Sequence, residues 1–209
     1  MRVKTEAKRE AILDAASKVF LEAGFEGASM AEIAKMVGGS KATLYSYFKS
    51  KEDLFVDVIH RAAHQQIDPL VDALSQDNDD LTKALQVFGE QVLSFMCAAP
   101  TIQSRRVVIA ESGRSDIGRR FHEQGPKEGM QKVAEFLARQ MDLGKLKKSD
   151  PLLAALQLAA LLECETVFPL LLGIETEMPP ERIKWAVERA LQTFFAAHGP
   201  SPDPADTAA

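Results

Sequence analysis

The stretch from Ser29 to Lys51, SMAEIAKMVGGSKATLYSYFKSK, constrains the fold more than any other, because it predicts two short helices joined by a glycine turn. Ser29 and Glu32 have the spacing of a capping box, which satisfies amide groups at the start of a helix. Gly38 supplies the positive φ that ends this helix, and Ser40 can cap the next one. Two short helices joined by so tight a turn predict a helix-turn-helix motif.

The same stretch is basic. From Ile33 to Lys51 there are four lysines and no acidic residue, with serine, threonine and tyrosine hydroxyls between them. Residues 1–51 hold nine Lys/Arg and six Asp/Glu, a charge of +3, whereas the whole chain carries −5, so the remainder carries −8. Lysines, hydroxyls and helix-start amides are the groups that bind phosphate oxygens. This asymmetry indicates local phosphate binding, with a chance fluctuation as the alternative.

Helical periodicity continues through the rest of the chain, and no segment alternates as a strand does. We therefore predict an all-α fold of about nine helices. Residues 1–67 are expected to form a helix-turn-helix domain, residues 68–198 a larger helical domain, and residues 199–209 a disordered tail rich in Pro, Ala and Asp. Beyond the motif, the expected helices span residues 5–23, 50–68, 80–96, 101–112, 116–124, 127–141, 151–172 and 180–197.

Three signals mark where these helices begin and end. Gly24 should stop the first helix, and Pro69 should end the helix that begins at Ser50. The acidic run at residues 77–79 can cap the helix that follows it.

Composition limits the class of protein. The apolar fraction of 46% suits a packed globule, and neither a secretory signal nor an apolar run long enough to span a bilayer is present. We therefore expect a soluble, cytoplasmic protein without a membrane partner. Cys97 and Cys164 lie in apolar helical stretches and are expected to be buried thiols.

The sequence offers no pattern for catalysis, a cofactor or a metal. His60 and His64 have a two-ligand spacing on one helix, but no third ligand is evident nearby. We find neither a nucleophile–base arrangement nor a glycine-rich phosphate loop. The expected protein is not an enzyme and has no cofactor and no metal.

The run GASMAEIAKMVGGSKATLYSYFKSKEDLF resembles the signature of the TetR/AcrR family of one-component transcriptional regulators. The resemblance is strong over about residues 5–67. It is weaker over the body, where ESGRSDIGRRFHEQGPKEGM and an apolar helix ending in LLLG are similar to the AefR-like branch. Gly39 departs from the family, which usually has an apolar residue there. The resemblance implies a helix-turn-helix DNA-binding domain followed by a ligand-binding and dimerisation domain.

The resemblance also implies DNA contacts within the motif. The start of the second helix would face a phosphate, and the third helix would enter the major groove, where Thr43 can touch a thymine methyl or a base edge. Tyr47 is ambiguous, since its ring can serve the core with only the hydroxyl outside. The implied contact residues are Ser29, Met30, Ser40, Lys41, Ala42, Thr43, Tyr45, Ser46, Tyr47 and Lys51.

A single helix-turn-helix touches few bases, so useful affinity needs two copies on a palindromic operator, and hence a homodimer. The last two long helices carry more apolar surface than one small helical body readily covers. Plain intramolecular core is the alternative for these side chains. The expected dimer interface comprises Leu158, Leu162, Ile183, Val187, Leu191 and Phe194.

A ligand-binding body needs a cavity, and the resemblance implies a small, largely apolar effector. Ordinary core is the alternative for each lining residue. Glu163 and Glu165 interrupt an apolar helix, and either can instead pair with an arginine or face the dimer partner. The expected pocket residues are Phe88, Val92, Phe95, Met96, Ile109, Phe121, Met130, Glu163 and Phe168.

These features favour a sequence-specific DNA-binding regulator, most simply a repressor that a small ligand releases from its operator. An activator or a ligand-independent regulator remains an alternative. A helical small-molecule-binding or enzymatic dimer that has lost DNA binding is a third possibility, and the uninterrupted run of lysines and hydroxyls argues against it.

Overall fold

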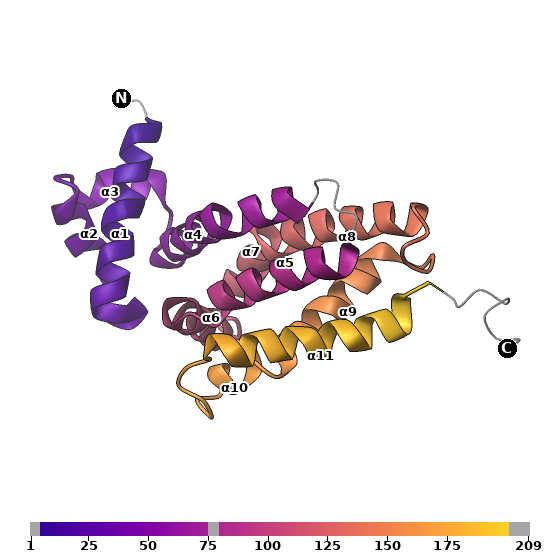
Figure 1. The fold of residues 1–209 in the computed structure, drawn as a ribbon. Coiled ribbons are helices and arrows are strands. Elements are labelled where there is room, and N and C mark those ends of the chain that lie inside the picture. Colours follow the sequence, from indigo (N-terminus) through magenta and orange to yellow (C-terminus); the bar gives the residue numbers. More distant parts are fainter. Residues whose placement is uncertain (1–4, 75–79, 201–209) are drawn as a thin grey trace, which may run out of the picture. The chain divides into compact units, whose positions relative to one another are not determined.

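The computed structural model describes residues 5–74 and 80–200, and every regular element in those ranges is a helix (Figure 1). This confirms the predicted all-α fold class. The predicted tail falls, apart from residues 199 and 200, outside the described residues, and so does the predicted cap at residues 77–79. In chain order the helices are α1 (Glu6–Gly27), α2 (Met30–Met36), α3 (Lys41–Tyr47), α4 (Lys51–Leu74), α5 (Leu81–Met96), α6 (Ala99–Glu111), α7 (Ile117–Gln124), α8 (Pro126–Asp142), α9 (Pro151–Cys164), α10 (Val167–Leu171) and α11 (Pro180–His198).

The chain divides into two compact units. The first comprises residues 1–65 and 104–125, and the second comprises residues 66–103 and 126–209. The first break lies close to the boundary expected after residue 67. The sequence did not indicate that residues 104–125, which include α7, belong with the first unit. As a result, α4 and α6 each contribute residues to both units.

The first unit has its own apolar core, built from α1 to α4 together with α6 and α7. Gly24 has a φ of 71° and interrupts the regular helix where a stop was predicted, although α1 continues beyond this kink to Gly27. Phe25, which follows the kink, is buried. The Phe55 ring packs against Phe20 and Phe25, with ring centroids 5.0 and 4.8 Å apart. These aromatic contacts join the C-terminal part of α1 to the start of α4, between which α2 and α3 lie in sequence.

The second unit is built around α5, α8, α9 and α11, and its core is larger. Close packing is visible at Gly89 of α5, where an added Cβ would lie 3.0 Å from Val187 and 3.3 Å from Leu162. Among the described residues, none of these helices combines the length and apolar character that crossing a bilayer requires.

This packing contradicts the residues that were expected to form the dimer interface. All six residues assigned to it are buried within a single chain, with side chains at most 5% exposed. They form part of the second unit's own core, so a partner cannot contact them. The alternative of intramolecular core was the right one for these residues: Leu158, Leu162, Ile183, Val187, Leu191 and Phe194.

Two helix boundaries also differ from expectation. α4 continues through Pro69 to Leu74, because Val71 and Leu74 of its last turns are buried in the second core. Tertiary packing there outweighs the cost of proline inside a helix. The single helix expected over residues 151–172 is divided into α9 and α10 at Thr166, whose buried hydroxyl donates to the Leu162 carbonyl over 2.8 Å. The observed cap of α5 is Asp80, which accepts from the Lys83 amide.

Candidate nucleic-acid interface

Local side-chain caps build the helix-turn-helix. Ser29 Oγ accepts from the Glu32 amide over 3.2 Å, and Ser40 Oγ accepts from the Thr43 amide over 3.1 Å. Gly38 lies between the two helices with a φ of 67°, in the left-handed region that favours glycine. The predicted helix starts and turn are therefore confirmed.

Helix α3, which the resemblance places in the major groove as the recognition helix, has a buried side and an exposed side. Leu44 is buried, and so is Phe48, which directly follows the helix. Lys41, Ala42 and Ser46 are exposed, and the Tyr45 side chain is 49% exposed. Helical spacing places these four residues on one stripe, since they lie at i, i+1, i+4 and i+5.

The exposed stripe, defined as Lys41, Ala42, Tyr45 and Ser46, carries an ammonium, a methyl and two hydroxyls. The Ser46 hydroxyl donates to the Thr43 carbonyl over 2.6 Å, so it must rotate before it can donate to a ligand. At the helix start, Ser40 Oγ lies 3.0 Å from Thr43 Oγ1, so these two hydroxyls are hydrogen-bonded to each other. Such groups suit phosphate oxygens and base edges in a major groove.

Two of the implied contact residues occupy different environments from those expected. The Met30 side chain is only 7% exposed and belongs to the core, so only its backbone amide at the start of α2 can face a phosphate. Lys51 Nζ donates to the carbonyls of Phe25 and Ala28 over 2.8 and 3.4 Å, and it lies 4.2 Å from the centroid of the Phe25 ring. Lys51 therefore holds the end of α1 against the start of α4, with most of its hydrogen-bonding capacity used internally.

The two tyrosines of the motif have different environments. Tyr45 lies on the exposed stripe, whereas Tyr47 is half-buried and its hydroxyl accepts from the Thr5 amide over 3.0 Å. The ambiguity noted for Tyr47 is resolved by this contact, which places the hydroxyl against the start of α1.

Sequence reasoning assigned no individual role to three lysines and one threonine around the motif. Lys35 and Lys49 are exposed on either side of α3 and were counted only as charge. Lys8 of α1 donates from Nζ to the Val37 carbonyl over 3.0 Å, and Thr5 is tied to Tyr47. No local pattern could reveal the last two contacts, because each joins residues about 30 or 40 positions apart.

Helix α7 packs on α4 within the first unit. Arg120 forms an ion pair with Asp53, and His60 Nε2 lies 3.2 Å from the Phe121 carbonyl oxygen. Burial lowers the pKa of His60 below its usual value of 6.5 and outweighs the opposing effects of the Phe121 hydrogen bond and Asp57. An open groove of about 630 Å³ lies along this contact, lined by residues from the end of α3, from α4 and from α7.

The structure does not bring the nine expected pocket residues together. Phe88 is buried in the second core, and Val92 and Met96 pack against it. Phe95 and Met130 are half-buried in the same unit. Ile109 and Phe121 belong to the first unit, where Ile109 is 63% exposed, whereas the other seven expected residues belong to the second unit.

Glu163 and Phe168 line an open groove of about 220 Å³ on α9 and α10, together with Cys164. This volume is below the range of about 300–1,000 Å³ typical of small-molecule sites. Cys164 is exposed, contrary to expectation, while Cys97 is buried as expected.

Glu165 forms an ion pair with Arg189 of α11, and hydrogen bonding to that guanidinium lowers the pKa of Glu165. The expectation that one of the two glutamates pairs with an arginine is confirmed for Glu165. Within residues 5–74 and 80–200, no three His, Cys, Asp or Glu side chains gather as metal ligands would.

Family models match both halves of the chain. The model described as bacterial regulatory proteins, tetR family, matches residues 12–58. A second, described as AefR-like transcriptional repressor, C-terminal domain, matches residues 83–200. These matches agree with the resemblance stated from the sequence.

Individual relatives agree with the family models. The transcriptional repressor BepR of Brucella suis is 32% identical over 110 residues, which are 52% of this chain and 51% of BepR. The chain thus spans about half the length of this curated relative. A TetR-family regulator from Mesorhizobium loti has a TM-score of 0.83 at 25% identity, over 95% of this chain and all of that one. The flavonoid-responsive regulator FrrA has a TM-score of 0.73 at 32% identity, with the same coverage.

Proposed function

Because the chain belongs to the tetR family of bacterial regulatory proteins, we propose that it is a sequence-specific DNA-binding transcriptional repressor, without catalytic activity, that acts in the cytoplasm. The observation that carries the proposal is the exposed stripe of α3. Its groups suit phosphate oxygens and base edges, and no acidic residue occurs between Ile33 and Lys51 to repel a phosphate.

In this proposal the stripe enters the major groove. Lys41 binds a phosphate, while Ala42 and Thr43 lie at base edges. Ser29, the Met30 backbone amide, Ser40, Tyr45 and Ser46 bind the sugar-phosphate backbone alongside. Phosphate contacts supply affinity and register, and the two residues at base edges supply discrimination between sequences.

A homodimer on a palindromic operator follows from the small size of one recognition helix. Two helices must reach major grooves one helical turn, about 34 Å, apart on one face of the duplex. Since the residues first expected at the interface are buried, we assign the interface to apolar side chains exposed on α9, α10 and α11. They are Leu152, Leu153 and Leu156 of α9, Phe168 of α10 and Trp185 of α11, which are between 41% and 58% exposed.

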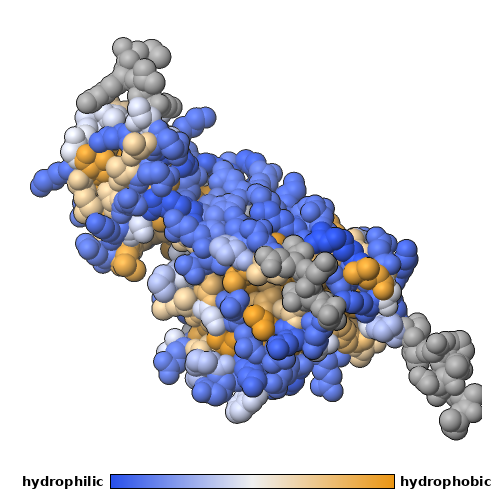
Figure 2. All heavy atoms as spheres, turned by 45° about the horizontal axis from the view of Figure 1, so that its top comes forward, coloured by the Kyte–Doolittle hydropathy of each residue, from blue (hydrophilic) through white to orange (hydrophobic). Residues whose placement is uncertain are grey.

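Exposed apolar area of this kind favours a second copy over solvent, because burying it removes apolar surface from water. Figure 2 shows one face of the molecule, on which small groups of apolar side chains interrupt a mainly hydrophilic surface.

The effector in this scheme is a small, largely apolar molecule that binds the second unit and releases the operator. FrrA, a relative across 95% of this chain, is described as flavonoid-responsive, so flavonoids are the first compounds to test. α4 and α6 contribute residues to both units, which supports coupling between them. Coupling of about 1–3 kcal/mol would weaken operator binding about five- to 150-fold.

The experiment is selection of duplexes from a random-sequence pool by the wild-type protein, followed by affinity measurement with and without a flavonoid panel. The proposal expects a palindromic consensus and weaker binding when an effector is present. Selection without a consensus would refute sequence-specific binding. Activation of a reporter by the selected duplex would favour the activator instead.

A further inference from the structure

The start of α1 contacts the motif on both sides of α3: at the last residue of α3, and at the end of α2, just before the turn that leads into α3. Thr5 donates from its amide to the Tyr47 hydroxyl over 3.0 Å, at the C-terminal end of α3. One turn later, Lys8 donates from Nζ to the Val37 carbonyl over 3.0 Å, where the chain enters the turn before α3. Thr5 also caps α1 by accepting from the Lys8 amide over 3.3 Å, so the two contacts start from one local structure.

The turn itself supplies little to hold α3. It contains Gly38 and Gly39, and a Cβ built on Gly39 would meet only the Ala34 carbonyl oxygen, at 3.9 Å. Its backbone contacts run back to α2, through the amides of Gly38 and Gly39. An apolar side chain in the turn would anchor α3 to the core, and two glycines cannot do so. The contact from Lys8 therefore falls at the start of a turn that has no side chain of its own to anchor α3.

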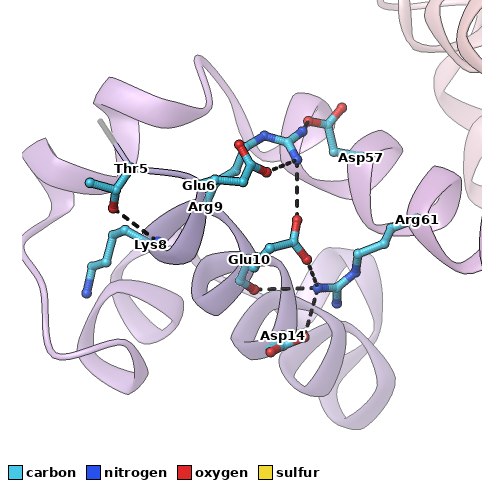
Figure 3. Close-up of polar contacts among 8 residues, drawn as sticks. All are labelled: Thr5, Glu6, Lys8, Arg9, Glu10, Asp14, Asp57 and Arg61. Atoms are coloured by element: carbon cyan, nitrogen blue, oxygen red, sulfur yellow. Dashed lines mark hydrogen bonds and ion pairs between the residues drawn. The ribbon is translucent and has the colours of Figure 1, made fainter. Parts of the chain in front are cut away.

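The donors on α1 are themselves well anchored. Arg9, next to Lys8, forms an ion pair of 2.6 Å with Asp57 of α4. Arg61 of α4 pairs with Glu10 at 2.9 Å and with Asp14 at 2.8 Å. Figure 3 shows these ion pairs gathered along the side of α1 that faces α4, with the Lys8 side chain pointing away from them. The start of α1 is thus held to α4 on one side and holds α3 and its turn on the other.

We propose that Lys8 and Tyr47 are positioning residues for sequence recognition: they set where the exposed stripe of α3 lies, and they act on discrimination between sequences instead of on phosphate binding. This assigns different tasks to the two tyrosines, with Tyr45 binding DNA and Tyr47 placing the helix that carries it. The proposal rests on the proposed DNA-binding function.

The physical reason is the different tolerance of the two kinds of contact. Reading a base edge requires placement to within about 0.5 Å, whereas a lysine or tyrosine can follow a phosphate through rotamer changes. A slightly displaced α3 should therefore lose discrimination while keeping most of its affinity for arbitrary DNA. A residue that binds phosphate should instead lose affinity for every duplex alike and reduce the salt dependence.

The test compares two probes: a duplex selected by the wild-type protein from a random pool, and a scrambled duplex of the same length and composition. Lys8→Met and Tyr47→Phe remove the two contacts and preserve side-chain size. We expect each to weaken binding to the selected duplex about five- to tenfold, with unchanged binding to the scrambled duplex and an unchanged salt slope. Lys8→Arg, which keeps a donor, should restore most of the discrimination.

Three variants provide the contrast. Lys18→Met removes an exposed lysine from the same helix and should change neither affinity. Lys41→Met and Tyr45→Phe remove proposed phosphate contacts and should lower the affinity for both duplexes by similar factors. Amide hydrogen exchange over residues 37–47, measured without DNA, should quicken in Lys8→Met and Tyr47→Phe but not in Lys18→Met.

The proposal is overturned if Lys8→Met and Tyr47→Phe leave the ratio of the affinities for the selected and scrambled duplexes unchanged, whether or not the affinities themselves fall. If Lys8→Met does not fold, Tyr47→Phe decides the question, since it removes one oxygen atom. If the wild-type protein selects no sequence at all, the proposed function fails first. The exchange measurement then still reports separately whether the two contacts hold α3.

Discussion

The guanidinium of Arg120 forms an ion pair with the carboxylate of Asp53, and this contact joins α7 to the first turn of α4. Asp53 is only 8% exposed. It follows Ser50, whose hydroxyl accepts from the Asp53 amide over 3.0 Å. Helix α7, which begins more than 60 residues after Asp53, is thereby attached to the first turn of α4, close to the end of the recognition helix.

Arg120→Met should destabilise the first unit by about 1–3 kcal/mol, because it leaves the buried Asp53 carboxylate without its charged partner. The neighbouring Arg119 provides a matched control, since its side chain is 60% exposed and it forms ion pairs with Asp116 and Glu123, which are close to it in sequence. Arg119→Met should cost no more than about 0.5 kcal/mol. Urea unfolding of the two variants compares these values, and equal losses would argue against a special role for Arg120.

Lys41→Ala should weaken binding to any duplex and reduce the slope of log affinity against log salt by about 1, because one phosphate contact is lost. Lys184→Ala, at an exposed lysine of α11 in the second unit, is the control for a change in net charge. Fluorescence anisotropy at several salt concentrations measures both. A salt slope equal to that of the wild type would rule out the Lys41 contact.

Leu156→Lys should raise the dissociation constant of the proposed dimer about tenfold or more, because it places an unpaired charge within an apolar contact. Leu21 of α1 is more exposed, at 73% against 48%, but lies in the first unit. Leu21→Lys should therefore leave association unchanged. Sedimentation equilibrium would distinguish them, and a dimer insensitive to Leu156→Lys would place the interface elsewhere.

The two glycines of the turn should respond in opposite directions to alanine. Gly38→Ala should destabilise the protein by about 1 kcal/mol or more, because a Cβ is strained at the φ of 67° found there. Gly39 has no positive φ and open space around its Cα. Gly39→Ala should therefore be neutral or stabilising by up to about 1 kcal/mol, through reduced entropy of the unfolded chain. Thermal unfolding of both variants provides the comparison.

Acidification should destabilise the first unit through His60. Burial lowers the pKa of His60 in the folded protein below 6.5, with Asp57 and His64 of α4 and Gln124 of α7 as its polar neighbours. The unfolded chain then binds more protons as pH falls, so this part of the stability is complete above about pH 6.5 and is lost below it.

The free energy of unfolding, measured between pH 7.5 and 5.5, should fall less steeply in His60→Gln than in the wild type. His122→Gln removes an exposed histidine of α7 and serves as the control. An identical pH dependence in wild type and His60→Gln would show that His60 does not carry it.

Local sequence was sufficient for the elements of the motif. Caps such as Ser29 and Ser40 act within three residues, and a glycine such as Gly38 decides a turn by its own φ, so these features could be predicted without tertiary contacts. The inward Leu44 and outward Lys41 follow from helical periodicity in the same way. The basic character of the motif is likewise a property of sequence alone.

Helical periodicity shows which apolar side chains lie on the same side of a helix, but it does not show whether their own chain or a second copy covers that side. Leu158 and Phe194 were expected to face a second copy and instead fill the core of their own chain. Met30, expected to face a phosphate, is buried for the same reason.

Long-range polar contacts carry even less local signal. The sequence by itself determined the class of fold, the caps and turn of the motif, and the basic stretch that it carries. Only the tertiary structure decided that Lys51 holds α1, that Tyr47 meets Thr5, and that Arg120 meets Asp53. Each of these contacts depends on where distant helices come to rest, which is set by the packing of the whole core and not by the residues beside them in sequence.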